Sequence, residues 1–397
     1  MAPRRKIWIF AGEESGDKYG ARLARELSRQ LGGDVDLAGM GAKAMREAGV
    51  RILVDSTELG VVGAVEIFKH IFTFVKIFLG LVRQAEEERP DVVVLIDYPG
   101  FNLRFAKQMF KRGIPVVWYV SPQVWVWGKR RIPKLAKYCA KMLVIFPFET
   151  ETYAGSGLDV EFVGHPLVDI VKEKIDPSLR RDPTKFLLLP GSRSNEINHV
   201  LVPMLKAVME LRRQRPELTF HVSAARPKLE RRIHEIVAAF RAKHGDALPP
   251  LEVLHGQNSR LLRECCAGMS ASGTVTVECA IAGLPLVVMY VFNLFTFVAA
   301  IVVIRKLFRN SFTMPNIIAD KTIYEEFLQH QIGPKRLAAA CVRILPGGER
   351  REEVLRDIQT LADTQLTCGK ENASANAAAA VIRCVDKLRQ QGAVTDR

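Results

Sequence analysis

Residues 91–102, DVVVLIDYPGFN, contain an apolar run that ends in an aspartate and is followed by a turn. The run is apolar at every position rather than at alternate ones, which is typical of a parallel strand buried on both faces. A second such run, KFLLL at 185–189, is followed by PGSRSNE at 190–196. Each run therefore predicts a central strand of an α/β sheet, with a polar loop at its carboxyl end.

Further apolar runs, separated by helical patterns, occur around both of these segments. The expected strands are Ile7–Ala11, Ile114–Val120, Lys141–Phe146 and Val160–Val163 in the first half and Leu218–Ala224, Leu251–His255 and Leu284–Tyr290 in the second. A chain of 397 residues exceeds one ordinary domain, and prolines cluster between the halves. We therefore predict two Rossmann-like, doubly wound domains, 1–170 and 171–348, that face a central cleft. Helices at 349–397 are expected to pack back toward the first domain.

The composition narrows the possible partners and the compartment. A net charge of +14 favours a polyanion, meaning nucleic acid, anionic lipid or a phosphorylated substrate. Nucleic acid is disfavoured because no recognition motif or arginine-rich block is present. The seven cysteines are odd in number and form no C-x-x-C pair, which argues against a zinc site or a disulfide framework. The apolar run Ile7–Phe10 is too short for a signal peptide, so we expect a cytoplasmic protein.

The loops of the first half carry candidate catalytic and binding groups. Asp97, at a strand's carboxyl end, is suited to act as a general base; the alternative is a structural aspartate that stabilises the following turn. AGEESGD at 11–17 offers groups that would bind hydroxyls, or else it is only a helix start capped by Ser15 or Asp17. The tryptophans of SPQVWVW at 121–127 could line a groove or pack in the core.

The loops of the second half are suited to phosphate. In 190–196, small residues permit close approach and Arg193 can bind two phosphate oxygens, although a surface turn with a solvated arginine is the alternative. ASGTVTVE at 271–278 could donate backbone N–H groups to a pyrophosphate, and Glu278 could hold ribose hydroxyls. His165, between the halves, is interpreted as structural.

Taken together, these motifs resemble the lipid-A-disaccharide synthase family. The matching segments, in chain order, are AGEESGD, IDYPGFN, YVSPQVWVW, FPFE, FVGHP, LLPGSR, ASGTVTVE and PNIIA. The resemblance implies a GT-B fold and an inverting glycosyltransferase without metal or other cofactor. It implies transfer of 2,3-diacylglucosamine from its UDP conjugate to lipid X, the 1-phosphate monosaccharide, with release of UDP. Asp97 and Arg193 match the essential aspartate and arginine of the family.

The resemblance and the loop positions together define two sets of expected binding residues. The expected nucleotide-sugar residues are Gly191, Ser192, Arg193, Ser272, Gly273, Thr274, Glu278 and Asn316. The expected acceptor residues are Gly12, Glu13, Ser15, Asp17, Asn102, Ser121, Gln123 and Trp125.

Some positions depart from the family pattern and leave other functions open. The departures are Glu14 for a small residue, Gly100 for an aspartate, Val291 for a cation and Asp320 for a glycine. One alternative is another GT-B enzyme, either a different lipid-linked glycosyltransferase or a sugar-nucleotide epimerase. The other is a nucleotide-sugar-binding, membrane-docking relative without turnover, against which the retained Asp97 and Arg193 argue.

Two long apolar segments, 67–82 and 284–304, suggest contact with a membrane. The second begins as an expected strand and is followed by cations, a pattern typical of a protein lying on an anionic leaflet rather than spanning it. Burial in the core is the alternative for parts of both. We expect a peripheral protein on the inner face of the inner membrane. The expected contacts are Phe295, Phe297, Arg305, Lys306 and Arg309.

Overall fold

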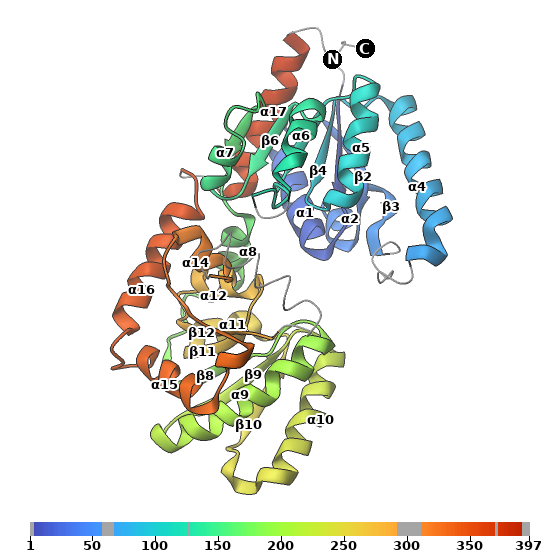
Figure 1. The fold of residues 1–397 in the computed structure, drawn as a ribbon. Helices are drawn as coiled ribbons and strands as arrows, with labels where there is room; N and C mark the ends of the chain where they lie inside the picture. The colour runs from blue at the N-terminus through green and yellow to red at the C-terminus, as the bar shows by residue number, and fades with distance from the viewer. Residues whose placement is uncertain (1–3, 58–66, 126–127, 292–310, 370–371, 391–397) are drawn as a thin grey trace. The chain divides into compact units, whose positions relative to one another are not determined.

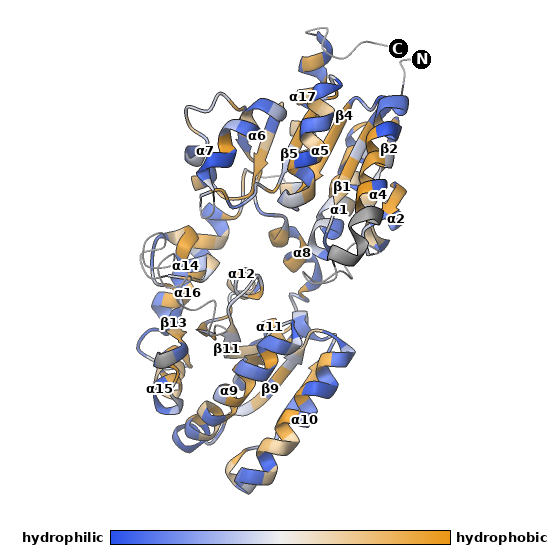
Figure 2. Cartoon of the chain, turned by 45° about the vertical axis from the view of Figure 1, so that its right-hand side comes forward, coloured by the Kyte–Doolittle hydropathy of each residue, from blue (hydrophilic) through white to orange (hydrophobic). Residues whose placement is uncertain are grey.

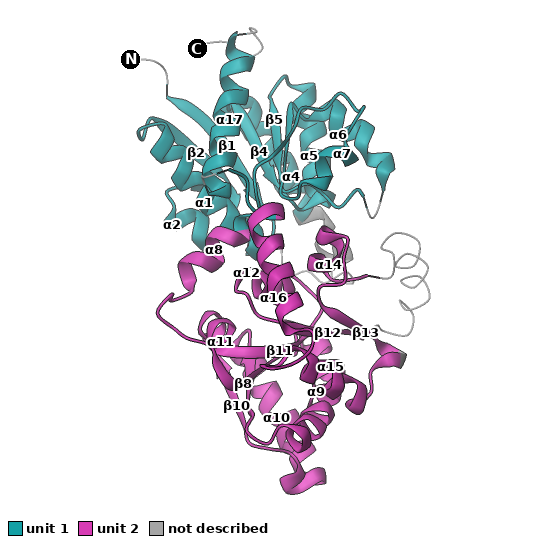
Figure 3. Ribbon diagram, turned by 90° about the vertical axis from the view of Figure 1, so that its left-hand side faces the viewer, with its two compact units in different colours: residues 1–166, 366–397 teal, residues 167–365 magenta. Residues whose placement is uncertain are grey.

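A computed structural model describes residues 4–57, 67–125, 128–291, 311–369 and 372–390 (Figure 1). The chain forms two compact units, residues 1–166 with 366–397 and residues 167–365 (Figure 3). The boundaries expected from the sequence were 1–170, 171–348 and 349–397. The structure divides the C-terminal helices instead, because α16 (Arg351–Thr360) belongs to the second unit and α17 (Ala373–Gln390) to the first.

The first unit contains a parallel sheet in the order β3-β2-β1-β4-β5-β6-β7. The strands are β1 Arg5–Ala11, β2 Val35–Gly41, β3 Arg51–Asp55, β4 Val92–Ile96, β5 Val116–Tyr119, β6 Lys141–Val144 and β7 Val160–Phe162. The strand β4 is buried throughout, as its continuous apolar pattern predicts, and is orange along its length in Figure 2. In the register, Ile96 pairs with both Ala11 and Tyr119, so the loops after β1, β4 and β5 leave the sheet at one edge.

Helices flank this sheet, and several of them position the loops at its edge. They are α1 Glu14–Gln30, α2 Lys43–Glu47, α4 Ile67–Glu88, α5 Pro99–Lys111, α6 Ile132–Tyr138, α7 Phe148–Thr152 and α17. The helix α17, red in Figure 1, completes the unit formed by the blue N-terminal strands. Its buried face consists largely of alanines, which let helices approach closely, and Ala375 O accepts a hydrogen bond from Gln30 Nε2 at 3.0 Å.

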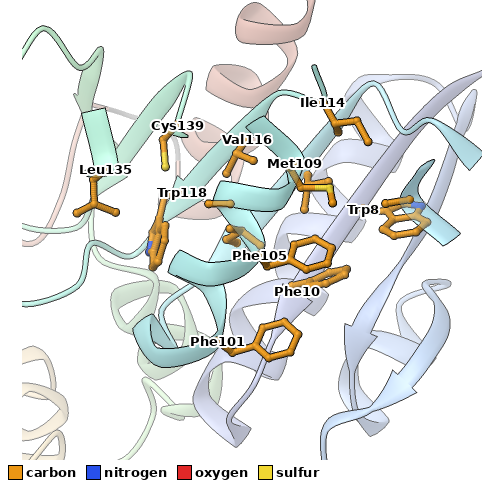
Figure 4. Close-up of a cluster of buried hydrophobic side chains, with 14 of the residues drawn as sticks. Trp8, Phe10, Phe101, Phe105, Met109, Ile114, Val116, Trp118, Leu135 and Cys139 are labelled. Carbon is orange, nitrogen blue, oxygen red and sulfur yellow. The ribbon is translucent and has the colours of Figure 1, made fainter. Parts of the chain in front are cut away.

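An aromatic cluster fixes α5 against the sheet (Figure 4). The Phe105 ring lies 4.6 Å from the Phe10 ring and 5.9 Å from the Phe101 ring, measured between centroids. Burying such a side chain stabilises the fold by about 1.5–3 kcal/mol. Because α5 begins two residues after Asp97, this packing also limits how far the turn at Asp97 can move.

The second unit contains a parallel sheet in the order β10-β9-β8-β11-β12-β13. The strands are β8 Asp182–Leu189, β9 Thr219–Ala224, β10 Leu251–His255, β11 Cys265–Ala271, β12 Leu286–Tyr290 and β13 Glu325–Leu328. The helices are α8 Pro166–Lys174, α9 Ser194–Gln214, α10 Pro227–His244, α11 Asn258–Glu264, α12 Val275–Ile281, α14 Met314–Ala319, α15 Pro334–Ile344 and α16.

The central strand β11 was not predicted from the sequence. Its residues, CCAGMSA, are small apart from Met269 and carry none of the β-branched or aromatic side chains that signal a strand. Small size is required here, because a Cβ on Gly268 would lie 2.7 Å from Leu187 O on the neighbouring strand β8. Close backbone packing therefore requires glycine at position 268.

The described part of the second apolar segment is confirmed as a strand, since Leu286–Tyr290 forms β12. The first apolar segment lies within α4, where Val75 and Leu79 are 49% and 59% exposed. No helix among the described residues is both long and apolar enough to cross a bilayer. The expected membrane residues Phe295, Phe297, Arg305, Lys306 and Arg309 lie outside the described residues.

Candidate active site

The turn after β4 holds Asp97 in an unusual backbone conformation. Asp97 and Tyr98 have φ angles of 45° and 46°, in the left-handed region that few residues other than glycine adopt. The buried Asn102 secures this turn, because its Nδ2 donates to Ile96 O at 3.2 Å and to Asp97 O at 2.7 Å. The Asn102 side-chain amide therefore positions the turn that carries Asp97. Strain of this kind is frequently found at functional sites.

The carboxyl group of Asp97 has the acidity expected of a general base. The pKa of this carboxyl group is raised from 3.8 to about 6, mainly by burial and to a smaller extent by the negative charge of Glu13. A hydrogen bond from the Tyr98 amide lowers the pKa and offsets part of this rise. The carboxylate is thus mostly ionised at neutral pH and is more basic than an exposed aspartate.

Gly12 is required for packing against Tyr98. A Cβ at this position would fall on the Tyr98 ring, so no other residue fits unless the ring moves. This close approach brings the exposed Glu13 near enough to affect Asp97 electrostatically. Gly12 thus has a packing role in the site, whereas the sequence predicted it as a ligand.

The remaining residues of AGEESGD differ in their surroundings. Asp17 is buried, and its Oδ1 accepts from the Ala42 amide at 2.6 Å while its Oδ2 accepts from the Ala44 amide at 2.9 Å. Its carboxylate therefore caps the start of α2, and we withdraw it from the acceptor site. Ser15 is exposed on the first turn of α1. Glu14, one of the departures from the family pattern, forms an ion pair with Lys18 at 2.8 Å.

A cavity of about 290 Å³ opens beside Asp97 in the first unit. It is lined by Asp97, Pro99, Val120, Ser121, Pro122, Gln123, Val124, Arg131, Ile145, Phe146 and Glu149. The structure thus brings together Asp97 and two predicted acceptor residues, Ser121 and Gln123. Trp125 does not line it: the Trp125 ring packs edge-on against Phe148 at 5.0 Å.

Glu149, in the FPFE segment, is a member of this cavity that the sequence analysis quoted but gave no role. Its Oε2 accepts hydrogen bonds from the Ile145 and Phe146 amides, both at 3.2 Å. Burial raises its pKa to about 7, although these amides and the side chains of Ser121 and Trp125 act in the opposite direction. Glu149 thus joins the loops after β5 and β6, which form the cavity wall. Its position in the first turn of a short helix after β6 was the available signal.

His165 is buried at the edge of the first unit. Its backbone amide donates to Leu366 O at 2.7 Å, and its ring lies 5.2 Å from that of Phe146. Burial lowers its pKa to about 3, so the ring is neutral at physiological pH. This agrees with the structural interpretation of His165.

In the second unit, the loop after β8 is organised around Glu196. Its Oε2 accepts from the Ser192 amide at 3.0 Å and the Arg193 amide at 3.3 Å, and its Oε1 pairs with Arg193 Nη1 at 3.0 Å. Gly191, with φ of 115°, lies so close that a Cβ there would be 2.7 Å from Glu196 Oε2. The Glu196 carboxylate therefore accepts hydrogen bonds from the same backbone N–H groups that we expected to bind phosphate. The Arg193 side chain remains 80% exposed.

The loop after β11 contains the other predicted nucleotide residues. Gly273 and Thr274 are exposed, and Ser272 is half-buried. Glu278 accepts a long hydrogen bond from Asn258 Nδ2 at 3.4 Å, a partner that the sequence analysis missed.

Asn316 has an internal role in the second unit. Its Oδ1 accepts from the amides of Ile323 and Tyr324, and its Nδ2 donates to Tyr324 O, all within 2.9 Å. Its amide is thus engaged by the backbone, and we withdraw it from the nucleotide site. Nearby, Asp320 has φ of 48°, a conformation that explains why glycine is usual there.

The fold class is supported by solved structures. A putative UDP-N-acetylglucosamine 2-epimerase from Listeria monocytogenes has a TM-score of 0.62 and 14% identity, covering 99% of this chain and 98% of that one. The calicheamicin glycosyltransferase CalG4 has a TM-score of 0.59 and 16% identity, covering 97% and 99%. The protein thus has the two-domain α/β fold of the GT-B class, as predicted.

Sequence comparison defines the family within that class. A family model described as lipid-A-disaccharide synthetase matches residues 7–381. Lipid-A-disaccharide synthase of Koribacter versatilis is 36% identical over 381 residues, 93% of this chain and 95% of that protein. The enzyme of Trichlorobacter lovleyi is 35% identical over 352 residues, 87% and 89% of the two chains. The chain belongs to the lipid-A-disaccharide synthase family and is a glycosyltransferase of lipid A biosynthesis, which confirms the resemblance.

Proposed function

We propose that this enzyme transfers 2,3-diacylglucosamine from its UDP conjugate to lipid X, forming the lipid A disaccharide with inversion and releasing UDP. The observation that carries the proposal is Asp97, a carboxylate with a pKa of about 6 that lines a cavity of about 290 Å³. Family membership supports the reaction type.

In the proposed mechanism, Asp97 acts on the acceptor. Its carboxylate accepts the proton of the acceptor's sugar hydroxyl, and the hydroxyl oxygen forms a bond to the donor's anomeric carbon. The bond from that carbon to the UDP oxygen breaks at the same time, and the electron pair leaves with UDP. A single displacement from the opposite face inverts the anomeric centre. Gln123, which is exposed in the same cavity, is suited to orient the acceptor's polar groups. The buried Ser121 hydroxyl is held by Tyr153 Oη at 2.8 Å and Pro122 O at 3.0 Å, so we propose that it shapes the cavity wall.

The exposed loops of the second unit are proposed to hold the donor. Negative charge develops on the pyrophosphate as it departs, and an aligned guanidinium with backbone N–H groups stabilises that charge. Arg193 and the loops at 191–193 and 272–274 carry such groups. Because the Glu196 carboxylate now accepts from Ser192 and Arg193, it must turn away before a phosphate can take its place.

We also propose that the enzyme docks on the anionic inner face of the inner membrane. Both proposed substrates carry acyl chains, and each methylene that leaves the bilayer costs about 0.8 kcal/mol. The exposed Val75 and Leu79 of α4 offer apolar surface for this contact. The segment with Phe295, Phe297, Arg305, Lys306 and Arg309 is proposed as the second contact.

Mass spectrometry of the products from UDP-2,3-diacylglucosamine and lipid X tests the proposal. We expect UDP and a tetra-acylated disaccharide monophosphate, with NMR showing an inverted anomeric configuration. Interconversion of the donor sugar without disaccharide would indicate an epimerase. Binding of UDP with no change in either substrate would indicate a relative without turnover.

A further inference from the structure

Arg131 lines the same cavity as Asp97, although neither the motifs nor the expected site residues included it. We propose that Arg131 binds the phosphate monoester of the acceptor, so that one sugar ring is held between this cation and the base. The inference rests on the proposed function, since it takes the acceptor to be a phosphorylated sugar. It adds a specificity residue and a phosphate subsite to the first unit.

Arg131 ends a short helical turn that begins after Gly128. The Arg131 amide donates to Gly128 O at 2.8 Å, closing the turn Lys129–Arg131. Gly128 has φ of 102°, and a Cβ there would lie 3.7 Å from Cγ, Cδ and Nε of Arg131. The arginine stem thus lies close to Gly128, and its side chain lines the cavity.

The exposed guanidinium group of Arg131 has no carboxylate partner among the described residues. Within the described ranges, Arg131 forms neither an ion pair nor a side-chain hydrogen bond, whereas arginines such as Arg46 and Arg51 pair with acidic groups. Of the two carboxyl groups in the cavity, Glu149 is engaged by backbone amides. A cation left without a partner at a cavity favours an anionic ligand, and a planar guanidinium matches two phosphate oxygens.

The size of the cavity agrees with this assignment. A volume of about 290 Å³ is at the lower end of the range for small-molecule sites. Such a volume suits a sugar ring with its phosphate but leaves no room for several acyl chains. Lys129 and Arg130, which precede Arg131 and are exposed, increase the positive potential at the site.

The experiment removes the cation and the phosphate separately and then together. Arg131→Gln is compared with wild type on lipid X and on the same diacylglucosamine without its 1-phosphate. Lys134→Gln is the matched control, because Lys134 is exposed on the next helix, carries the same charge and does not line the cavity. Arg131→Lys keeps the charge but loses the two-pronged contact.

We expect Arg131→Gln to lower kcat/KM for lipid X by about ten- to hundredfold, through KM, as for loss of a charge-assisted contact. The kcat/KM of wild type should fall by a similar factor when the acceptor lacks its 1-phosphate. Arg131→Gln should have the same kcat/KM for both acceptors. Arg131→Lys should be intermediate and Lys134→Gln normal. Equilibrium binding of lipid X in detergent micelles gives the same comparison without turnover, and thermal melting shows which variants fold.

The inference would be overturned if wild type and Arg131→Gln showed the same ratio of kcat/KM between lipid X and the acceptor without its 1-phosphate. A rise in the UDP dissociation constant of Arg131→Gln, with lipid X binding unchanged, would assign the cation to the donor's pyrophosphate and overturn it as well. Failure of the proposed function is distinguishable, because wild type would then form no disaccharide from either acceptor.

Discussion

Asn102 Nδ2 lies 2.7 Å from the backbone oxygen of Asp97 and donates a hydrogen bond to it from one turn along α5. This contact and the packing of α5 hold two successive left-handed residues in place. The orientation of the proposed base thus depends on a buried amide that does not line the cavity.

Asn102→Ala should therefore slow the reaction although it leaves the Asp97 side chain intact. A displacement of about 1 Å at a reacting group can cost a hundredfold in rate. We expect kcat to fall by about ten- to hundredfold while UDP affinity stays unchanged, as measured by steady-state kinetics and calorimetry. Normal kcat in a folded variant would show that the turn holds its shape without the amide.

Asp97→Asn should abolish most activity and stabilise the fold. Loss of a general base costs about a hundredfold to ten-thousandfold in rate. Because the folded-state pKa of about 6 exceeds the ordinary 3.8, the protonated carboxyl favours folding. That stabilisation is complete below about pH 4 and is lost as pH rises through 6.

Asparagine stays neutral, so above pH 6 the variant should be more stable than wild type by at most about 3 kcal/mol. Urea unfolding at pH 5 and pH 8 measures this difference. Asp34→Asn, at an exposed aspartate, controls for the change in net charge. Near-normal turnover of Asp97→Asn would refute the base assignment.

The rate should depend on pH through the same group. Protonated Asp97 cannot accept the acceptor's proton, so kcat/KM should fall about tenfold per pH unit below the pKa of about 6. UDP binding by calorimetry should not follow this profile. A rate that stays constant down to pH 5 would mean that Asp97 is not the group titrating.

The two members of the Arg193–Glu196 ion pair should affect UDP affinity in opposite directions. Arg193→Ala should raise the UDP dissociation constant about tenfold or more, because a charge-assisted phosphate contact is lost. Glu196→Gln should lower it severalfold, since the carboxylate occupies the Ser192 and Arg193 amides. Weaker UDP binding by Glu196→Gln would show instead that the carboxylate preorganises the loop.

Membrane binding should be reversible and sensitive to salt. Each cation near an anionic surface contributes about 1 kcal/mol, which salt screens. Replacing Arg305, Lys306 and Arg309 by Gln should reduce sedimentation with anionic liposomes, and carbonate should release the enzyme from native membranes. Release by detergent alone would contradict peripheral binding.

The sequence by itself determined the two-sheet α/β class, most of the strands and the place of the proposed base, but not β2, β3, β11 and β13. A strand buried on both faces must be apolar throughout, so β4 and β8 were evident, and Asp97 followed from its place at a strand end. The sequence did not indicate β11, because this strand lacks β-branched and aromatic residues and contains Gly268, which its neighbour β8 requires to be small.

Only the tertiary structure decided what the polar side chains contact. Asp17, Asn102 and Asn316 lie in the motifs but bind backbone groups, whereas Glu149 and Arg131 converge on the cavity from different loops. The physical reason is that a polar side chain takes the partners that folding brings within about 3 Å. Asp17 binds amides 25 and 27 residues away, whereas Asn102 and Asn316 bind backbone groups five to eight residues away. In each case the backbone path, and not the residue type, brings the partner within reach.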